Sequence, residues 1–106
     1  MFDEYFKERL DIETIRDRSG FICFKILGEE CFIQELFVLR EMRNLGMAHR
    51  LIEAVESRAR DSGCKYLTTS VHAPAKGSTL AIKTVLSNGG KLIGVQGQDI
   101  YFKKEL

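Results

Sequence analysis

The part of the sequence best suited to chemistry is a short turn at residues 43–48, which joins an apolar segment to an amphipathic one. Before the turn, Cys31–Leu39 is apolar and β-branched enough to form a strand. After it, Met47–Ala59 carries apolar residues at helical spacing with charges between them. A strand that passes directly into a helix leaves the first N–H groups of the helix unpaired, and the helix dipole adds partial positive charge there. The turn is therefore a predicted anion site.

The residue types in this turn fit a pyrophosphate group. Gly46 has no side chain where a phosphate would approach the backbone, Ala48 keeps the next turn small, and Arg43 adds a full positive charge. The residues predicted to contact the phosphates are Arg43, Asn44, Leu45, Gly46, Met47 and Ala48. The alternative is an ordinary strand-to-helix turn of an α/β domain, in which Gly46 is present for geometry alone.

Length and charge narrow the class of protein. With 106 residues the chain is expected to form one domain, with an N-terminal helical part at 1–19 and a core at 20–106. Sixteen basic and fifteen acidic side chains are interspersed and leave a net charge of +1, so neither nucleic acid nor an anionic membrane is an expected partner. No apolar run approaches the ~20 residues that span a bilayer, and Met1–Glu4 is acidic, so we expect a cytoplasmic protein.

The cysteine and histidine residues do not predict a metal site. Cys23, Cys31 and Cys64 lie within or at the edge of predicted strands and lack the close paired spacing of zinc ligands, so we expect reduced core residues. His49 and His72 lie far from any matching group of ligands.

The remaining segments alternate as in an α/β domain. Phe21–Leu27 is an apolar run with a short polar link to Cys31–Leu39, which predicts an antiparallel hairpin. Lys65–His72 follows the helix that stops near Gly63, and strand–helix–strand connectivity predicts that it lies parallel to Cys31–Leu39.

A second helix is predicted over Ser78–Asn88, followed by a hairpin of Lys91–Val95 and Asp99–Lys103. The first twenty residues are expected to form one short helix or two broken ones. We expect a mixed sheet with the helices at 46–62 and 78–88 on opposite faces. The predicted core contains Phe24, Ile26, Leu36, Val38, Leu51, Val55, Leu67 and Val71.

The turn and the strand before it carry a family resemblance. Arg43-x-x-Gly46-x-Ala48, after the strand 35–38 that reads Glu-Leu-Phe-Val, resembles the acyl-CoA-binding signature Q/R-x-x-G-x-G/A of the GCN5-related N-acetyltransferase (GNAT) family. The element order over residues 20–105, about four fifths of the chain, is similar to that family's fold from its third strand onward. The resemblance implies an α/β acyl-CoA N-acyltransferase fold with helices on both faces of a mixed sheet, without the first strand and most of the first two helices. The acceptor side is then expected to be open or completed by a second subunit.

The resemblance also implies acetyl-CoA as co-substrate. In this family the pantetheine arm lies where two parallel strands separate, and it pairs with exposed backbone as an added strand would. Phe37 and Val38 would offer that backbone here, with Val71 and His72 on the other side. Ser78 stands where an asparagine often contacts the cofactor.

Catalysis by this route needs a base and an acid. Acetyl transfer requires a neutral amine, and Glu35, His72 or water are the candidates for removing its proton. The family commonly protonates the thiolate with the tyrosine of a pattern like A-x-x-L-Y-x-x-x-G-F. The segment 81–90 has Val85 or Leu86 at that place, so Tyr101 on the last strand is the candidate substitute.

The leading hypothesis is transfer of an acetyl group from acetyl-CoA to a primary amine of a small molecule, peptide or protein. The first alternative is a non-catalytic module of the same fold that binds acyl-CoA or a protein partner. The second is a small α/β interaction domain that binds no nucleotide. Phe2, Tyr5 and Phe6 in so short a chain favour a homodimer.

Overall fold

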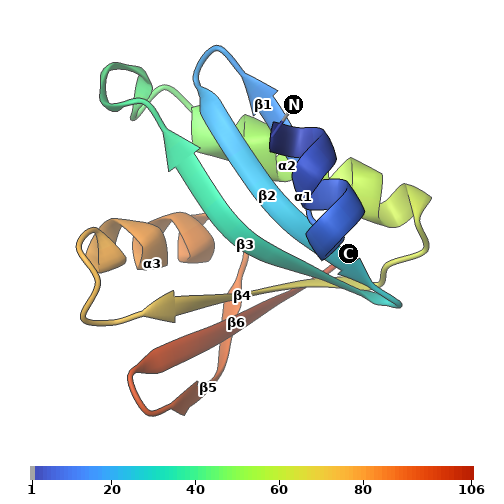
Figure 1. The fold of residues 1–106 in the computed structure, drawn as a ribbon. Helices are drawn as coiled ribbons and strands as arrows, with labels where there is room; N and C mark the ends of the chain where they lie inside the picture. Colours follow the sequence, from blue (N-terminus) through green and yellow to red (C-terminus); the bar gives the residue numbers. More distant parts are fainter. Residues whose placement is uncertain (1) are drawn as a thin grey trace.

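Figure 1 shows a mixed sheet with helices around it in the computed structural model, which describes residues 2–106 apart from the side chain of Phe6. The helices are α1 (Phe2–Leu10), α2 (Met47–Asp61) and α3 (Ser78–Ser87), with a 3-10 turn η1 at Arg40–Met42. The strands are β1 (Glu13–Asp17), β2 (Gly20–Leu27), β3 (Glu30–Val38), β4 (Tyr66–His72), β5 (Lys91–Gln96) and β6 (Asp99–Glu105). From β2 onward, each predicted helix and strand begins and ends within two residues of its predicted position, whereas the turn η1 was not predicted.

The six strands form one sheet in the order β1-β2-β3-β4-β6-β5. β3 and β4 are neighbouring parallel strands, as the strand–helix–strand pattern predicts, and the other neighbours are antiparallel. The predicted hairpins of β2 with β3 and of β5 with β6 are both present. The α/β fold class is therefore confirmed.

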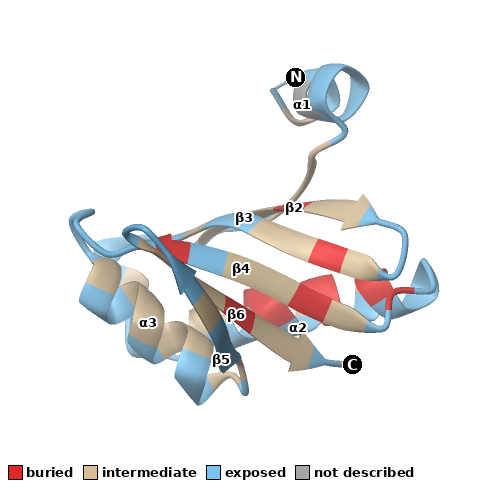
Figure 2. Ribbon diagram, turned by 90° about the horizontal axis from the view of Figure 1, so that it is seen from below, coloured by how far each residue is buried: buried red, intermediate tan, exposed pale blue. Residues whose placement is uncertain are grey.

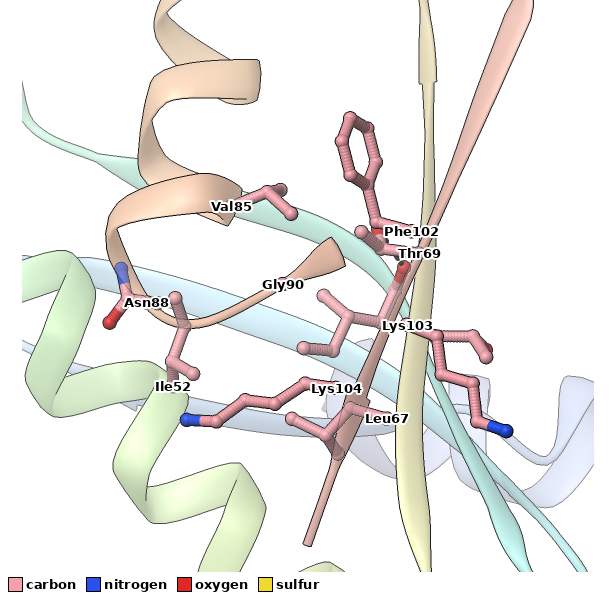
Figure 3. A pocket seen from close by; sticks show the side chains of 11 residues that line it. Ile52, Leu67, Thr69, Val85, Asn88, Gly90, Phe102, Lys103 and Lys104 are labelled. Carbon is pink, nitrogen blue, oxygen red and sulfur yellow. Dashed lines mark hydrogen bonds between the residues drawn. The ribbon is translucent and has the colours of Figure 1, made fainter. Parts of the chain in front are cut away.

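The expectation that α2 and α3 cover opposite faces of the sheet is wrong. Ile52 of α2 and Val85 of α3 line one cavity over the same face, together with Leu67 and Phe102 of the sheet (Figure 3). The connections β3–α2–β4 and β4–α3–β5 both step in the same direction across the sheet, and right-handed crossovers in one direction place their helices on one face. Figure 2 shows α1 on the other face.

The N-terminal part is only partly helical. Residues 2–10 form α1, but residues 13–17 form a strand that pairs antiparallel with β2, where a purely helical segment was expected. The free edge of β2 offers backbone partners, and Ile15 stands opposite the fully buried Ile22 and packs on the core. Ion pairs of Asp3 with Arg16 and of Lys7 with Glu13 connect α1 to β1. The sheet therefore begins at residue 13.

The core lies between the sheet and α2. The predicted core residues are buried or pack against the buried cluster, as Phe24, Leu51, Val55 and Leu67 illustrate. Two of the three cysteines also belong to this cluster. Burial raises the pKa of the Cys31 thiol to about 12, so it is protonated and unreactive at neutral pH. Within residues 2–106, no helix is long and apolar enough to cross a bilayer.

Candidate functional site

The main feature of the site is a gap between β3 and β4. The two strands pair from Glu30–Ile33 to Tyr66–Thr69, and beyond that point the structure gives no pairing between them. Figure 1 shows β3 and β4 diverging from this point toward their carboxyl ends. Over residues 34–38 and 70–72 the edge of each strand that faces the gap is therefore free of a neighbouring strand. Such edges bind an extended chain with amide groups, because its N–H and C=O groups replace those of a neighbouring strand.

A bulge in β3 explains why the strands separate at this point. The register between β2 and β3 shifts at Cys23/Phe24, where Cys23 stands opposite Glu35 and Phe24 opposite Ile33. Gln34 is therefore the extra residue, and such an insertion bends its strand and increases the local twist. The bend directs the rest of β3 away from β4.

The predicted anion site lies at the end of the β3 arm. Asn44 and Gly46 both have positive φ, of 62° and 78°, and Gly46 is the N-cap of α2. Arg50 is the first residue of α2 whose N–H reaches a carbonyl one turn back, the Gly46 carbonyl at 3.1 Å. Among residues 2–106, none accepts a hydrogen bond from the N–H groups of Met47 and Ala48. This helix start can therefore donate to an anion.

Gly46 is required here by backbone conformation. A Cβ at this position would meet nothing within 4 Å, so space is open on the outside of the turn. The positive φ alone disfavours other residues. A glycine is thus needed to make the turn, and the open space beside it is available to a ligand.

Basic side chains surround this turn. Arg43 donates from Nε to the Val38 carbonyl at 2.9 Å, and its guanidinium lies 5.8 Å from the centre of the Phe37 ring. A nearby hollow is lined in part by Arg18 and Arg50. The sequence prediction included neither arginine. Arg50 belongs to the first turn of α2, whereas Arg18 reaches the helix start only because the β1–β2 turn packs beside α2. Arg43 therefore already holds the Val38 carbonyl, which the family resemblance led us to expect as a partner of the pantetheine arm.

The candidate bases lie on the two arms of the gap. Glu35 is exposed and stands opposite Cys23 on the face away from α2, and among the described residues it has no ion-pair partner. His72, at the end of β4, is also exposed, and its Nδ1 lies 2.8 Å from Asp99 Oδ1. Asp99 was missed from the sequence, because its pairing with His72 depends on the register between β4 and β6. A carboxylate in this position can orient an imidazole for proton transfer.

The candidate acid lies on β6, and the remaining candidate cofactor residue lies at the start of α3. Tyr101 is half-buried on β6, opposite Ser70. By the alternation of side chains along β6 it points to the same face as Glu35, because its neighbour Phe102 is buried on the α2 face. Ser78 is the first residue of α3. Val85 faces the sheet, and Leu86 is exposed.

Residues 11–81 match the acetyltransferase (GNAT) family, and the chain belongs to this family. Its fold is that of GNAT acyl-CoA N-acyltransferases. No match was found among curated proteins.

Solved structures similar to the chain include three acetyltransferases. A PaiA N-acetyltransferase from Thermoplasma acidophilum, in complex with coenzyme A, is 20% identical with a TM-score of 0.75, over 83% of this chain and 54% of that one. A putative acetyltransferase from Agrobacterium tumefaciens is 24% identical with a TM-score of 0.73, over 97% and 84%. An acetyltransferase from Bacillus cereus is 16% identical with a TM-score of 0.73, over 97% and 90%. The chain thus spans about half the length of the first of these and most of the other two.

Proposed function

We propose that the chain binds acetyl-CoA and transfers its acetyl group to a primary amine. The observation that carries this proposal is the separation of β3 from β4 beyond Ile33 and Thr69, next to a helix start with free N–H groups. The first feature suits an extended arm with amides, and the second suits a pyrophosphate. Family membership and the coenzyme A in the PaiA structure support the same ligand.

The phosphates would lie at the start of α2. The N–H groups of Met47 and Ala48 would donate to them, with Asn44, Leu45 and Gly46 forming the turn around them. Arg43 supplies positive charge from the side of β3. The pantetheine arm would run along the edge of residues 34–38, where Arg43 Nε already holds the Val38 carbonyl, and Ser78 would flank it at the start of α3.

The transfer step is proposed to use Glu35 as the base, directly or through water. The ammonium group of the acceptor loses a proton to the base, and the neutral nitrogen attacks the thioester carbon. The new C–N bond forms as the C–S bond breaks, the nitrogen releases its second proton to water, and the coenzyme A thiolate leaves. A proton from Tyr101 or from water converts the thiolate to the thiol. His72, oriented by Asp99, is the alternative base.

A second candidate function is a non-catalytic module that binds acyl-CoA. One observation favours it: neither Val85 nor Leu86 can donate a proton to the thiolate, so the place of the family's usual acid is apolar. A proton for the thiolate would have to come from Tyr101 on β6, because α3 has no donor at the place of the usual tyrosine.

Calorimetric titration with acetyl-CoA tests both forms of the proposal. Binding is expected, and the absence of heat and of a thermal shift at millimolar acetyl-CoA would contradict it. Release of coenzyme A thiol is then followed with small amines, polyamines and peptides with a free N-terminus as acceptors. Release that depends on the acceptor supports transfer, whereas binding without release with any of these acceptors supports the non-catalytic module.

Variants of the two bases separate their roles. Glu35→Gln is expected to lower kcat by about 10²-fold or more with little change in acetyl-CoA binding. His72→Gln serves as the matched control, since it also replaces an exposed side chain at the gap by a neutral amide. If His72→Gln lowers kcat and Glu35→Gln does not, the base is His72.

A homodimer is also proposed. Phe2 and Tyr5 on α1 are 74% and 53% exposed, and a second copy could cover them; the side chain of Phe6, the third residue of the sequence argument, lies outside the described part. Sedimentation at micromolar concentration should show a species of twice the chain mass. A single 12.1-kDa species would contradict it.

A further inference from the structure

An apolar cavity lies at the closed end of the gap. It has a volume of about 50 Å³, and Ile33 and Thr69, the last pair of the β3–β4 ladder, form part of its wall. Figure 3 shows the other side chains that converge on it from α2, α3 and the sheet, namely Ile52, Val85, Leu67 and Phe102. A space of ~10–15 Å³ already admits a water molecule, so this cavity has room for a short aliphatic segment.

The polar side chains at the wall of this cavity are already engaged with other residues. They are Thr68 with Glu30, Thr69 with the Ile33 carbonyl, Asn88 with His49 and the Thr84 carbonyl, Lys103 with Glu105, and Lys104 with Glu56. A polar ligand would have to share these side chains with the partners they already have, and its own polar groups would lose their hydrogen bonds to water. An apolar group has no such cost.

The cavity also lies where the thioester of a bound acyl-CoA would arrive. The phosphate site at the start of α2 is at the open end of the gap, and α2 is on the same face of the sheet as the cavity. From there the free edge at residues 34–38 runs about 16 Å back to Ile33, at ~3.3 Å per residue. An arm extended along this edge therefore points its acyl group at the cavity.

We propose that the chain uses a short linear acyl group longer than acetyl, of about four carbons, whose terminal methylene and methyl groups fill the cavity beside Ile52, Val85 and Phe102. This inference rests on the proposed acyl-CoA binding and specifies the acyl group. Val85 is the position that sets chain length, since it stands at the cavity wall on α3 and a larger side chain there would occupy the space.

The test is a titration of the full chain with coenzyme A, acetyl-CoA, butyryl-CoA and octanoyl-CoA. Burial of one methylene strengthens binding by about fourfold, so the two extra methylenes of butyryl-CoA should give about fifteenfold tighter binding than acetyl-CoA. Octanoyl-CoA should lose this gain, because its chain exceeds the cavity. Equal affinity for acetyl-CoA and butyryl-CoA would overturn the inference.

Variants at Val85 connect the preference to the cavity. Val85→Phe should fill it and reduce the ratio of butyryl-CoA to acetyl-CoA affinity to near one. Val85→Ala should enlarge it and move the optimum to a longer chain, which tests the inference if Val85→Phe does not fold. Leu86→Phe is the control, because Leu86 is the next residue of α3, is 52% exposed and does not line the cavity.

The outcomes separate this inference from the proposed function. If neither coenzyme A nor any acyl-CoA binds, the proposed function is wrong and the inference is overturned with it. If coenzyme A and acetyl-CoA bind but the ratio is the same in the parent, Val85→Phe and Leu86→Phe, only the inference is overturned. A ratio that changes with Val85 and not with Leu86 supports it.

Discussion

Replacing Gly46 by glutamate tests whether the turn before α2 holds the pyrophosphate. The new side chain would enter the open space beside the turn, where no heavy atom lies within 4 Å of an added Cβ. A carboxylate about 5 Å from a phosphate charge is repelled by about 3 kcal/mol at an effective dielectric constant of ~20. Acetyl-CoA binding should therefore weaken by about a hundredfold.

The substitution also has a backbone cost that must be separated from the charge. With φ at 78°, any residue other than glycine is strained at position 46 by about 1–2 kcal/mol. Gly46→Gln has the same strain and nearly the same bulk without the charge, and Gly46→Ala has the strain alone. We expect the three variants to lose similar free energy of unfolding and to differ in binding.

The assay is calorimetric titration with acetyl-CoA at low and at physiological ionic strength, with urea denaturation of each variant. The difference between Gly46→Glu and Gly46→Gln should shrink as salt is added, because the site is exposed and its charges are screened over about 10 Å at 0.1 M. If a folded Gly46→Glu protein binds acetyl-CoA as tightly as Gly46→Gln, the turn does not hold the phosphates. The glycine would then serve the backbone alone.

Three further predictions concern the fold. Gly20→Ala should lower the free energy of unfolding in urea by at least about 3 kcal/mol, because an added Cβ would lie 1.9 Å from the Phe37 carbonyl oxygen; a loss below 1 kcal/mol would show that β2 and β3 can separate freely there. Cys31 should resist iodoacetamide at pH 8 in the native protein and react in urea, as read by mass spectrometry, because burial raises its pKa to about 12; rapid native labelling would contradict this. Hydrogen bonds from the Ser19 hydroxyl and N–H lower the pKa of Asp17 below 3.8. The Asp17 carboxylate therefore adds to the free energy of unfolding above pH 3.8, and this stabilisation is lost as the pH falls through the native pKa. Asp17→Asn should make thermal stability less dependent on pH below 3.8, and an unchanged profile would refute the assignment.

The local part of the site could be predicted from the sequence. The apolar strand that ends at Val38, the glycine at position 46 and the helical spacing from Met47 onward are encoded within about thirty consecutive residues, so their order and boundaries follow from short-range preferences. The parallel pairing of β3 and β4 could also be predicted from the sequence, because a strand–helix–strand unit favours parallel strands joined by a right-handed crossover. The core residues followed from the same periodicities.

The tertiary structure decided which residues meet around the gap. Residues 13–17 become a strand only because β2 offers them a free edge, and the faces covered by α2 and α3 depend on the direction of two successive crossovers. The place where β3 leaves β4 is set by a one-residue bulge at Gln34, which composition and periodicity do not reveal. The pairing of His72 with Asp99 and the cavity beside Val85 join residues far apart in the chain. Such contacts depend on strand register and on packing between distant segments, and a local sequence pattern specifies neither of them.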